Sequence, residues 1–189
     1  VVSLSGNNDV FWGDAGRNVL WFAAGADEYF QTLANTGLKT AGRKELSPLP
    51  QARPTSQPVA AELVSYRLEK NARLSAQALQ HVNADWIFFL QPTLSVTRKA
   101  LSSREQAFVP ASKNYFVQCY ELMSSRLAGL RQSNFRFVDL SKIFDGHQAT
   151  DEVFLDQFHF GDKGNAVIAD AMFYAIANYL AGQAAVSKP

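Results

Sequence analysis

Residues 1–9 read Val-Val-Ser-Leu-Ser-Gly-Asn-Asn-Asp, an apolar run that stops at a glycine and continues as three small polar side chains. Short runs of β-branched and aliphatic residues bounded in this way are typical of a buried strand in a parallel sheet. The carboxyl ends of such strands carry the reactive groups of open α/β sheets. The stretch therefore predicts a central strand that delivers polar side chains to a functional site. Central strands have neighbours on both sides, so we expect further strands upstream of Val1.

The composition predicts one globular domain spanning residues 1–189, because 47% of the chain is hydrophobic and can form a sizeable core. The 18 basic and 17 acidic residues nearly cancel and form no block of like charge, so we expect neither a nucleic acid nor an acidic membrane surface as partner. The single cysteine, Cys119, excludes an internal disulfide framework and a multi-cysteine metal site. No apolar run reaches the roughly 18 residues of a transmembrane helix. A small neutral or mixed substrate fits this composition.

Alternating strand and helix patterns predict an α/β fold, with a parallel sheet covered by helices on both faces. Apolar runs predict two further buried strands, at 86–90 and 135–140. Helical spacing of apolar residues predicts helices over about 14–33, 59–82, 102–132 (divided near Pro110) and the stretch after Asp162, which we expect to be an N-cap.

Residues 37–58 contain four prolines and predict a long exposed loop. Loops of this length are uncommon in compact domains. This one is either a surface excursion or a flap over the site, and the sequence favours neither.

Two polar clusters are the candidates for chemistry, Gly6-Asn7-Asn8-Asp9 and Asp156-Gln157-Phe158-His159. An Asp and a His three residues apart can hydrogen-bond, so that the carboxylate sets the ring tautomer while the other ring nitrogen faces a substrate. That arrangement suits a general base, although the spacing alone also fits a structural histidine. Gln91 ends the 86–90 strand beside Asn8, where it either lines a pocket or bonds the strand end.

Together the two clusters resemble the Gly-x-Asn-Asp and Asp-x-x-His blocks of the SGNH or GDSL-type hydrolases. The strand end Phe-Phe-Leu-Gln-Pro at 88–92 and the helix opening Gly-Asp-Lys-Gly-Asn at 161–165 extend the resemblance over most of the chain. The resemblance implies a flavodoxin-like three-layer α/β/α fold. It also implies a Ser-His-Asp esterase that cleaves acetyl or short acyl esters of small molecules or carbohydrates through an acyl-enzyme, without a cofactor.

The same resemblance implies a role for each matching residue. His159 would be the general base, Asp156 its orienting carboxylate and Asn8 an oxyanion donor. Gly6 would let the backbone approach closely, and Asp9 would brace the turn.

The chain departs from the family pattern because the Gly-Asp-Ser block, which carries the nucleophile, and a second glycine block are absent from it. Ser3 and Ser5 lie on the wrong strand to replace the nucleophile, and Ser95 and Ser141 have no supporting motif. We favour a chain whose upstream part carries the serine. A binding domain without catalysis and a second polypeptide that completes the sheet remain alternatives, as does an acyltransferase using the same site. The compartment, including a secreted or periplasmic one, and the oligomeric state stay open.

Overall fold

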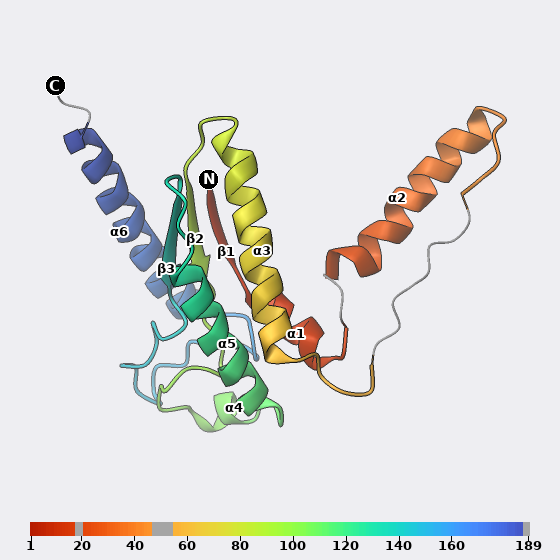
Figure 1. Cartoon of the computed structure of the whole chain (residues 1–189). Coiled ribbons are helices and arrows are strands. Elements are labelled where there is room, and N and C mark those ends of the chain that lie inside the picture. Colours follow the sequence, from red (N-terminus) through yellow and green to blue (C-terminus); the bar gives the residue numbers. More distant parts are fainter. Residues whose placement is uncertain (18–20, 47–54, 187–189) are drawn as a thin grey trace.

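The computed structural model describes residues 1–17, 21–46 and 55–186. Three parallel strands form one sheet in the order β1 (Val2–Ser5), β2 (Trp86–Leu90), β3 (Phe135–Asp139) (Figure 1). Ser5 pairs with Leu90, and Leu90 with Asp139, so the three strands end together at one carboxyl edge. The predicted α/β class and parallel sheet are confirmed.

The described residues form six helices. They are α1 (Asn7–Asp14), α2 (Trp21–Thr40), α3 (Ala61–Gln80), α4 (Ser103–Gln106), α5 (Lys113–Ala128) and α6 (Asp162–Val186). Of these, α3, α5 and α6 cover the two faces of this sheet, and Figure 1 shows α3 and α5 on one face and α6 on the other. The fold therefore has three layers, as the sequence predicts. The predicted helix over 59–82 and the division near Pro110 are confirmed.

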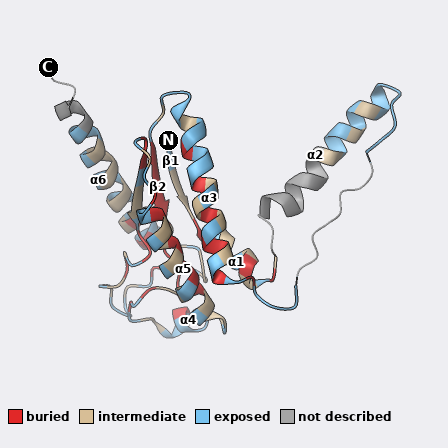
Figure 2. Ribbon diagram, in the orientation of Figure 1, coloured by how far each residue is buried: buried red, intermediate tan, exposed pale blue. Residues whose placement is uncertain are grey.

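The alternating side chains of β2 explain the two cores. Trp86, Phe88 and Leu90 point to the first face, where they pack with buried residues of α3 and α5 such as Leu68 and Met123. Residues 87 and 89 point to the second face, where they pack with Ile168 of α6 and with residues of the loop that precedes it. Figure 2 shows the buried residues concentrated in the sheet and on the inner sides of α3 and α5.

Residues 1–9 begin with a strand, as predicted, but this strand has only one neighbour among the described residues, and the upstream strands expected to make it central would lie outside residues 1–189. β2 occupies the centre and is buried along its whole length, whereas β1 lies at the edge, with Val2 45% exposed. The reason is that β1 is paired with β2 on one side only, while β2 has a strand on each side.

The polar turn after β1 is the start of a helix rather than an open loop. Gly6 adopts φ 113° as the N-cap residue, and α1 begins at Asn7. The helix predicted over 14–33 begins later, as α2 at Trp21, and runs on to Thr40, because α1 ends at Asp14 and Gly16 turns the chain with φ 70°. Glycine occupies this left-handed region without the steric cost that a side chain brings.

The last helix begins one residue earlier than predicted, because Asp162 is its first residue and not its N-cap. The amide of Asn165 donates to the carbonyl of Gly161 at 2.9 Å, which places Gly161 before the first turn. In that turn the Asp162 carboxylate lies near the positive end of the helix dipole.

The proline-rich segment is helical at its start, because α2 continues through Thr40. Residues 41–46 and 55–58 are exposed and irregular, as predicted, and 47–54 lie outside the described residues. The carbonyl of Gly16 accepts hydrogen bonds from the Thr55 amide at 2.8 Å and its hydroxyl at 3.1 Å, so the two ends of the excursion meet beside α1. Figure 1 shows α2 standing away from the sheet.

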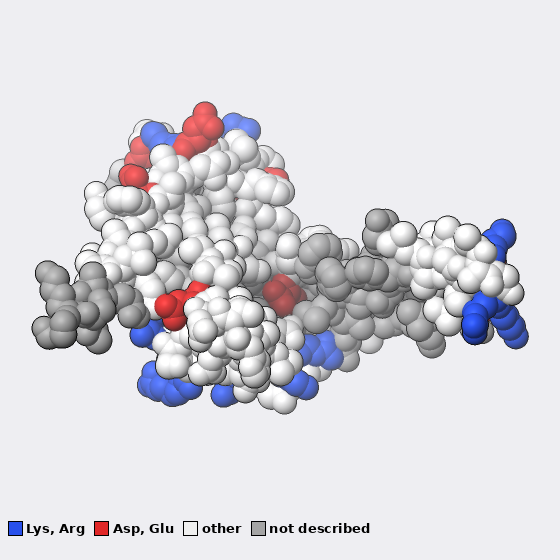
Figure 3. All heavy atoms as spheres, turned by 90° about the horizontal axis from the view of Figure 1, so that it is seen from above, with Lys and Arg blue, Asp and Glu red and all other residues white. Residues whose placement is uncertain are grey.

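Charged side chains of both signs lie around the rim of the face seen from above, and uncharged residues make up most of it (Figure 3). Within the described part of the chain, no helix combines the length and apolar character needed to cross a membrane.

Candidate active site

The candidate site lies at the carboxyl edge of the sheet, where the segments after β1 and β2 meet. The amide of Gln91 donates to the carbonyl of Ser5 at 2.9 Å and extends the pairing of the two strands by one step. Gln91 therefore follows β2 at the same edge of the sheet at which Gly6 follows β1.

Asp156 and His159 form a hydrogen-bonded pair at this edge. Nδ1 of the His159 ring lies 2.7 Å from Oδ2 of Asp156. The other carboxylate oxygen accepts from the amides of Phe158 at 2.7 Å and His159 at 2.9 Å. The His159 side chain is 75% exposed, so its Nε2 is accessible from solvent. The pair has the arrangement that a general base requires.

The surroundings of Asp156 keep it ionised. Burial alone would raise the pKa of its carboxyl, but the hydrogen bonds from the His159 ring and the two amides outweigh burial and hold the pKa below its ordinary value. An ionised carboxylate in this position stabilises positive charge on the imidazole ring.

The loop that carries the pair is docked on the segment after β2. The carbonyl of Gln157 accepts from the Leu94 amide at 3.2 Å and the Thr93 hydroxyl at 3.1 Å. The side-chain amide of Gln91 donates to the carbonyl of Phe158 at 3.3 Å. The sequence left open whether Gln91 lines a pocket or bonds a strand end, and the structure gives it this bond to the Asp-x-x-His loop.

An aromatic contact joins the two polar clusters. The Phe158 ring lies 5.4 Å from the ring of Phe11 in α1 and 6.3 Å from that of Phe116 in α5. Phe11 is three residues after Asn8, which is just under one helical turn. The first turn of α1 and the Asp–His pair therefore belong to the same edge of the molecule.

The two asparagines of the first cluster have opposite surroundings. Asn8 is exposed, while Asn7 is buried and its Oδ1 has no hydrogen-bond partner among the described residues. The first amides of a helix lack partners within the helix, so the start of α1 presents donors at the edge together with the Asn8 side chain. Gly6 permits this geometry, because a Cβ there would lie 2.5 Å from Cδ1 of Leu90.

Asp9 lies in the first turn of α1, where it is half-buried. Burial raises the pKa of its carboxyl to about 6, and a hydrogen bond with its own amide offsets part of the rise. The Tyr120 hydroxyl is buried nearby without a hydrogen-bond partner, and burial, then Asp139 and Asp9, raise its pKa.

No described serine hydrogen-bonds to His159. The hydroxyl of Ser3 accepts from the Trp86 indole at 2.9 Å, inside the fold. Ser95 and Ser141 are buried, and Ser95 accepts from the Gln157 side chain at 3.4 Å.

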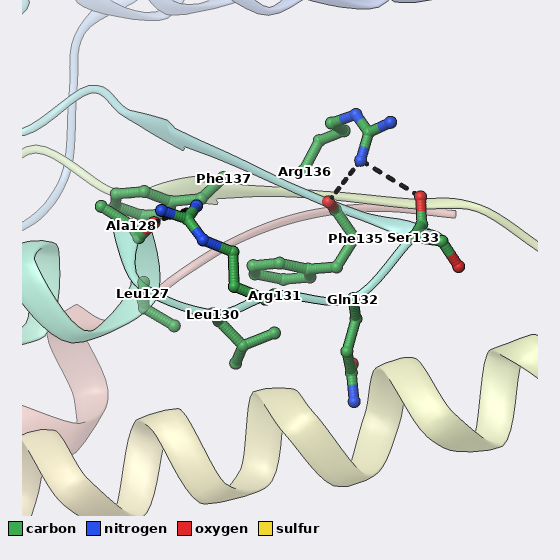
Figure 4. A pocket seen from close by; sticks show the side chains of 9 residues that line it. All are labelled: Leu127, Ala128, Leu130, Arg131, Gln132, Ser133, Phe135, Arg136 and Phe137. Carbon is green, nitrogen blue, oxygen red and sulfur yellow. Dashed lines mark hydrogen bonds between the residues drawn. The ribbon is translucent and has the colours of Figure 1, made fainter.

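A cavity of about 520 Å³ lies at the opposite end of the sheet, between α5 and β3 (Figure 4). Its Arg131 and Arg136 donate to backbone carbonyls of Ala128, Ser133 and Phe135. A second hollow of about 400 Å³ is lined by Leu101, Ser102, Ser103, Gln106, Ala149 and Thr150. Neither is lined by Asn8, Asp156 or His159. We place the candidate site at the carboxyl edge because the hydrogen-bonded pair of Asp156 and His159 lies there, and neither hollow has such a pair among its described residues.

Comparison of the chain with protein-family models, curated proteins and solved structures found no match. Among the described residues, no group of three or more His, Cys, Asp and Glu could hold a metal ion.

Proposed function

We propose that the protein is a serine hydrolase of the SGNH or GDSL type, with a flavodoxin-like fold, that cleaves acetyl or short acyl esters. The single observation that carries the proposal is the 2.7 Å bond between His159 and Asp156 at the carboxyl edge, with Nε2 of the ring exposed. The Gly-x-Asn-Asp and Asp-x-x-His motifs support it, because α1 and the Asp–His loop meet through Phe11 and Phe158.

In this mechanism His159 Nε2 takes the proton of a serine hydroxyl as the serine oxygen attacks the ester carbonyl carbon. Asp156 stabilises the imidazolium that forms. The Asn8 side-chain amide donates to the oxyanion of the tetrahedral intermediate. His159 then protonates the leaving alcohol. Water attacks the acyl-enzyme in the same way, with His159 again as general base, and releases the acid and the serine.

No described serine hydrogen-bonds to His159, so we propose that the nucleophilic serine is supplied by a segment beyond the described residues. It belongs to an upstream segment of the same polypeptide or to a second chain that completes the sheet. A serine-reactive fluorophosphonate probe tests this with the full-length protein. Mass spectrometry should locate the label on a serine outside these residues.

The proposal is tested by substitutions at the pair and at the oxyanion donor in the full-length protein. His159→Asn should lower kcat for a chromogenic acetate ester by about 10³-fold, because the general base is lost. Asn8→Asp keeps the size of the side chain but loses the amide donor, and it should lower kcat by about 10²- to 10³-fold. His81→Asn is the matched control, since His81 is an exposed histidine that follows the end of α3. Turnover by His159→Asn within tenfold of the unsubstituted protein would refute the proposal.

Two other functions give different results in the same assays. An acyltransferase would release an acylated sugar when a carbohydrate acceptor is present, with less free acid. A non-catalytic binding domain would hydrolyse no ester and take up no probe. The absence of a serine beside His159 in the described residues is the observation that favours this second reading.

A further inference from the structure

A buried ion pair lies in the segment that connects β2 to α5. Nζ of Lys99 is 2.7 Å from Oε2 of Glu105, and both side chains are fully buried. The other ion pairs between described residues all have partners exposed to solvent. Removing two charges from water is costly unless other hydrogen bonds compensate for the lost hydration.

The Glu105 carboxylate has those additional bonds. Oε2 also accepts from the Ser102 amide at 3.0 Å, within the same segment. Oε1 accepts from the amides of Val153 at 3.0 Å and Phe154 at 3.2 Å, in a segment 48 and 49 residues away in the sequence. One side chain thus joins the loop after β2 to the segment before the Asp-x-x-His motif.

The four donors also act on the charge state of Glu105. Burial alone would raise its pKa, but Lys99 and the three amides outweigh burial and hold the pKa below its ordinary value. The bridging group is therefore a carboxylate at neutral pH.

Residues 153 and 154 lead directly into the candidate catalytic loop. The Leu155 amide donates to the carbonyl of His159 at 2.8 Å, and the Gly161 amide donates to the carbonyl of Val153 at 3.0 Å. Phe154 and Phe160 form an isolated antiparallel bridge. This small ladder closes the loop that contains Asp156 and His159. Glu105 accepts hydrogen bonds from the amides of Val153 and Phe154, which belong to the first of the two segments of this ladder.

The outer side of the loop is much less restrained. His159 is 75% exposed and Asp156 is 45% exposed, so solvent surrounds much of the pair. Its orientation depends on the ladder and on the contacts of residues 157 and 158 with the segment after β2. An error of about 1 Å in the position of a catalytic group can cost about 10² in rate.

We propose that Glu105 is a positioning residue, whose hydrogen bonds to the Val153 and Phe154 amides set the orientation of the Asp156–His159 pair. Its effect on catalysis rests on the proposed hydrolase function, whereas its effect on the histidine does not. Lys99 serves as the counter-ion that allows a carboxylate to occupy this position.

Glu105→Gln in the full-length protein tests the proposal. A glutamine has one acceptor oxygen, so its NH₂ group must face either Lys99 and Ser102 or the two amides, which are all donors. We expect kcat for the acetate ester to fall by about 10- to 100-fold, with KM changed by less than about twofold. Glu152→Gln is the matched control, because Glu152 lies next to Val153 but is exposed and bonds the Ser102 hydroxyl.

Two further measurements do not depend on ester turnover. Hydrogen exchange at the amides of Val153 and Phe154 should accelerate selectively in Glu105→Gln. Two-bond ¹⁵N–¹H spectra of the imidazole rings should show His159 with its proton on Nδ1 in the unsubstituted protein. In the variant the population of the other tautomer should increase.

The outcomes separate the two proposals. If the unsubstituted protein hydrolyses no ester but the tautomer and exchange changes occur, the hydrolase proposal fails and the positioning role stands. If Glu105→Gln retains both its kcat and its His159 tautomer, the positioning role is overturned. Should Glu105→Gln fail to fold, Glu105→Asp decides by the same measurements, because it keeps a charge beside Lys99 but is too short to reach both amides.

Discussion

Asn7 and Asn8 are neighbours in the sequence, but the start of α1 separates their surroundings completely. Asn7 is buried with an unbonded Oδ1, and Asn8 is exposed at the carboxyl edge. In the proposed mechanism Asn8 is the oxyanion donor, and its exposed side chain is accessible to a substrate. Asn7 therefore packs inside this turn and is not part of its exposed surface.

Asp9 is expected to make the protein less stable as the pH rises through its titration. Its pKa of about 6, against an ordinary 3.8, means that the native state keeps a proton that the unfolded state releases between these values. The native state is therefore destabilised as the pH rises from about 4 to 6, by up to about 3 kcal/mol once the proton has left. Asp9→Asn has no carboxyl to ionise, so this variant avoids the destabilisation and should be more stable than the unsubstituted protein at pH 7.5.

Urea unfolding at pH 4.5 and 7.5 measures the difference. The gain from Asp9→Asn should be larger at pH 7.5 than at pH 4.5. Asp170→Asn, at an exposed position of α6, is the control and should give no such difference. An equal effect of Asp9→Asn at both pH values would contradict the raised pKa.

At the level of elements, the junction of β1 and α1 depends on one backbone conformation. Gly6 has φ 113°, and an added Cβ would lie 2.5 Å from Cδ1 of Leu90 and 3.6 Å from the terminal methyl group of Met123. Gly6→Ala therefore combines a strained backbone with overpacking against β2 and α5. We expect a loss of about 2–4 kcal/mol in the free energy of unfolding.

The control for this substitution is Gly146→Ala, because an added Cβ at Gly146 would meet no atom within 4 Å. It should change the unfolding free energy by less than about 1 kcal/mol. Urea denaturation of the two variants gives the comparison. A Gly6→Ala protein as stable as Gly146→Ala would show that the junction tolerates another conformation.

The whole molecule consists of an α/β body and a long connecting segment between Gly16 and Thr55, called the excursion here, which contains α2 and most of the predicted loop over 37–58. None of residues 31–46 is buried, and the bonds from Thr55 to the carbonyl of Gly16 already bring the ends together. Replacing residues 18–54 with a short Gly/Ser linker should leave the body folded. Its free energy of unfolding should stay equal or rise by up to about 2 kcal/mol, because a shorter loop costs less entropy to close.

Circular dichroism and urea unfolding of the shortened protein test this. The body should retain a cooperative transition, and loss of that transition would show that the excursion forms part of the core. The same protein separates the two readings of the excursion. A flap over the site would change the preference among acyl chain lengths, while a simple surface excursion would leave it unaltered.

The sequence by itself determined the features that depend on neighbouring residues. The run at 86–90 is apolar throughout and forms the buried central strand, and the apolar spacing within 59–82 places α3. The bond between Asp156 and His159 joins residues three apart, so their spacing predicts it. Local periodicity and local reach contain this information.

Only the tertiary structure decided the features that depend on distant segments meeting. β1 lies at the edge because of which strand pairs with it, and α1 starts at Asn7 because Gly6 turns the chain against Leu90. From the sequence alone Glu105 resembles an ordinary surface residue of a short helix. In the structure the amides of Val153 and Phe154 donate to its carboxylate. Such contacts arise from how the layers pack together, and no periodicity along the chain records them.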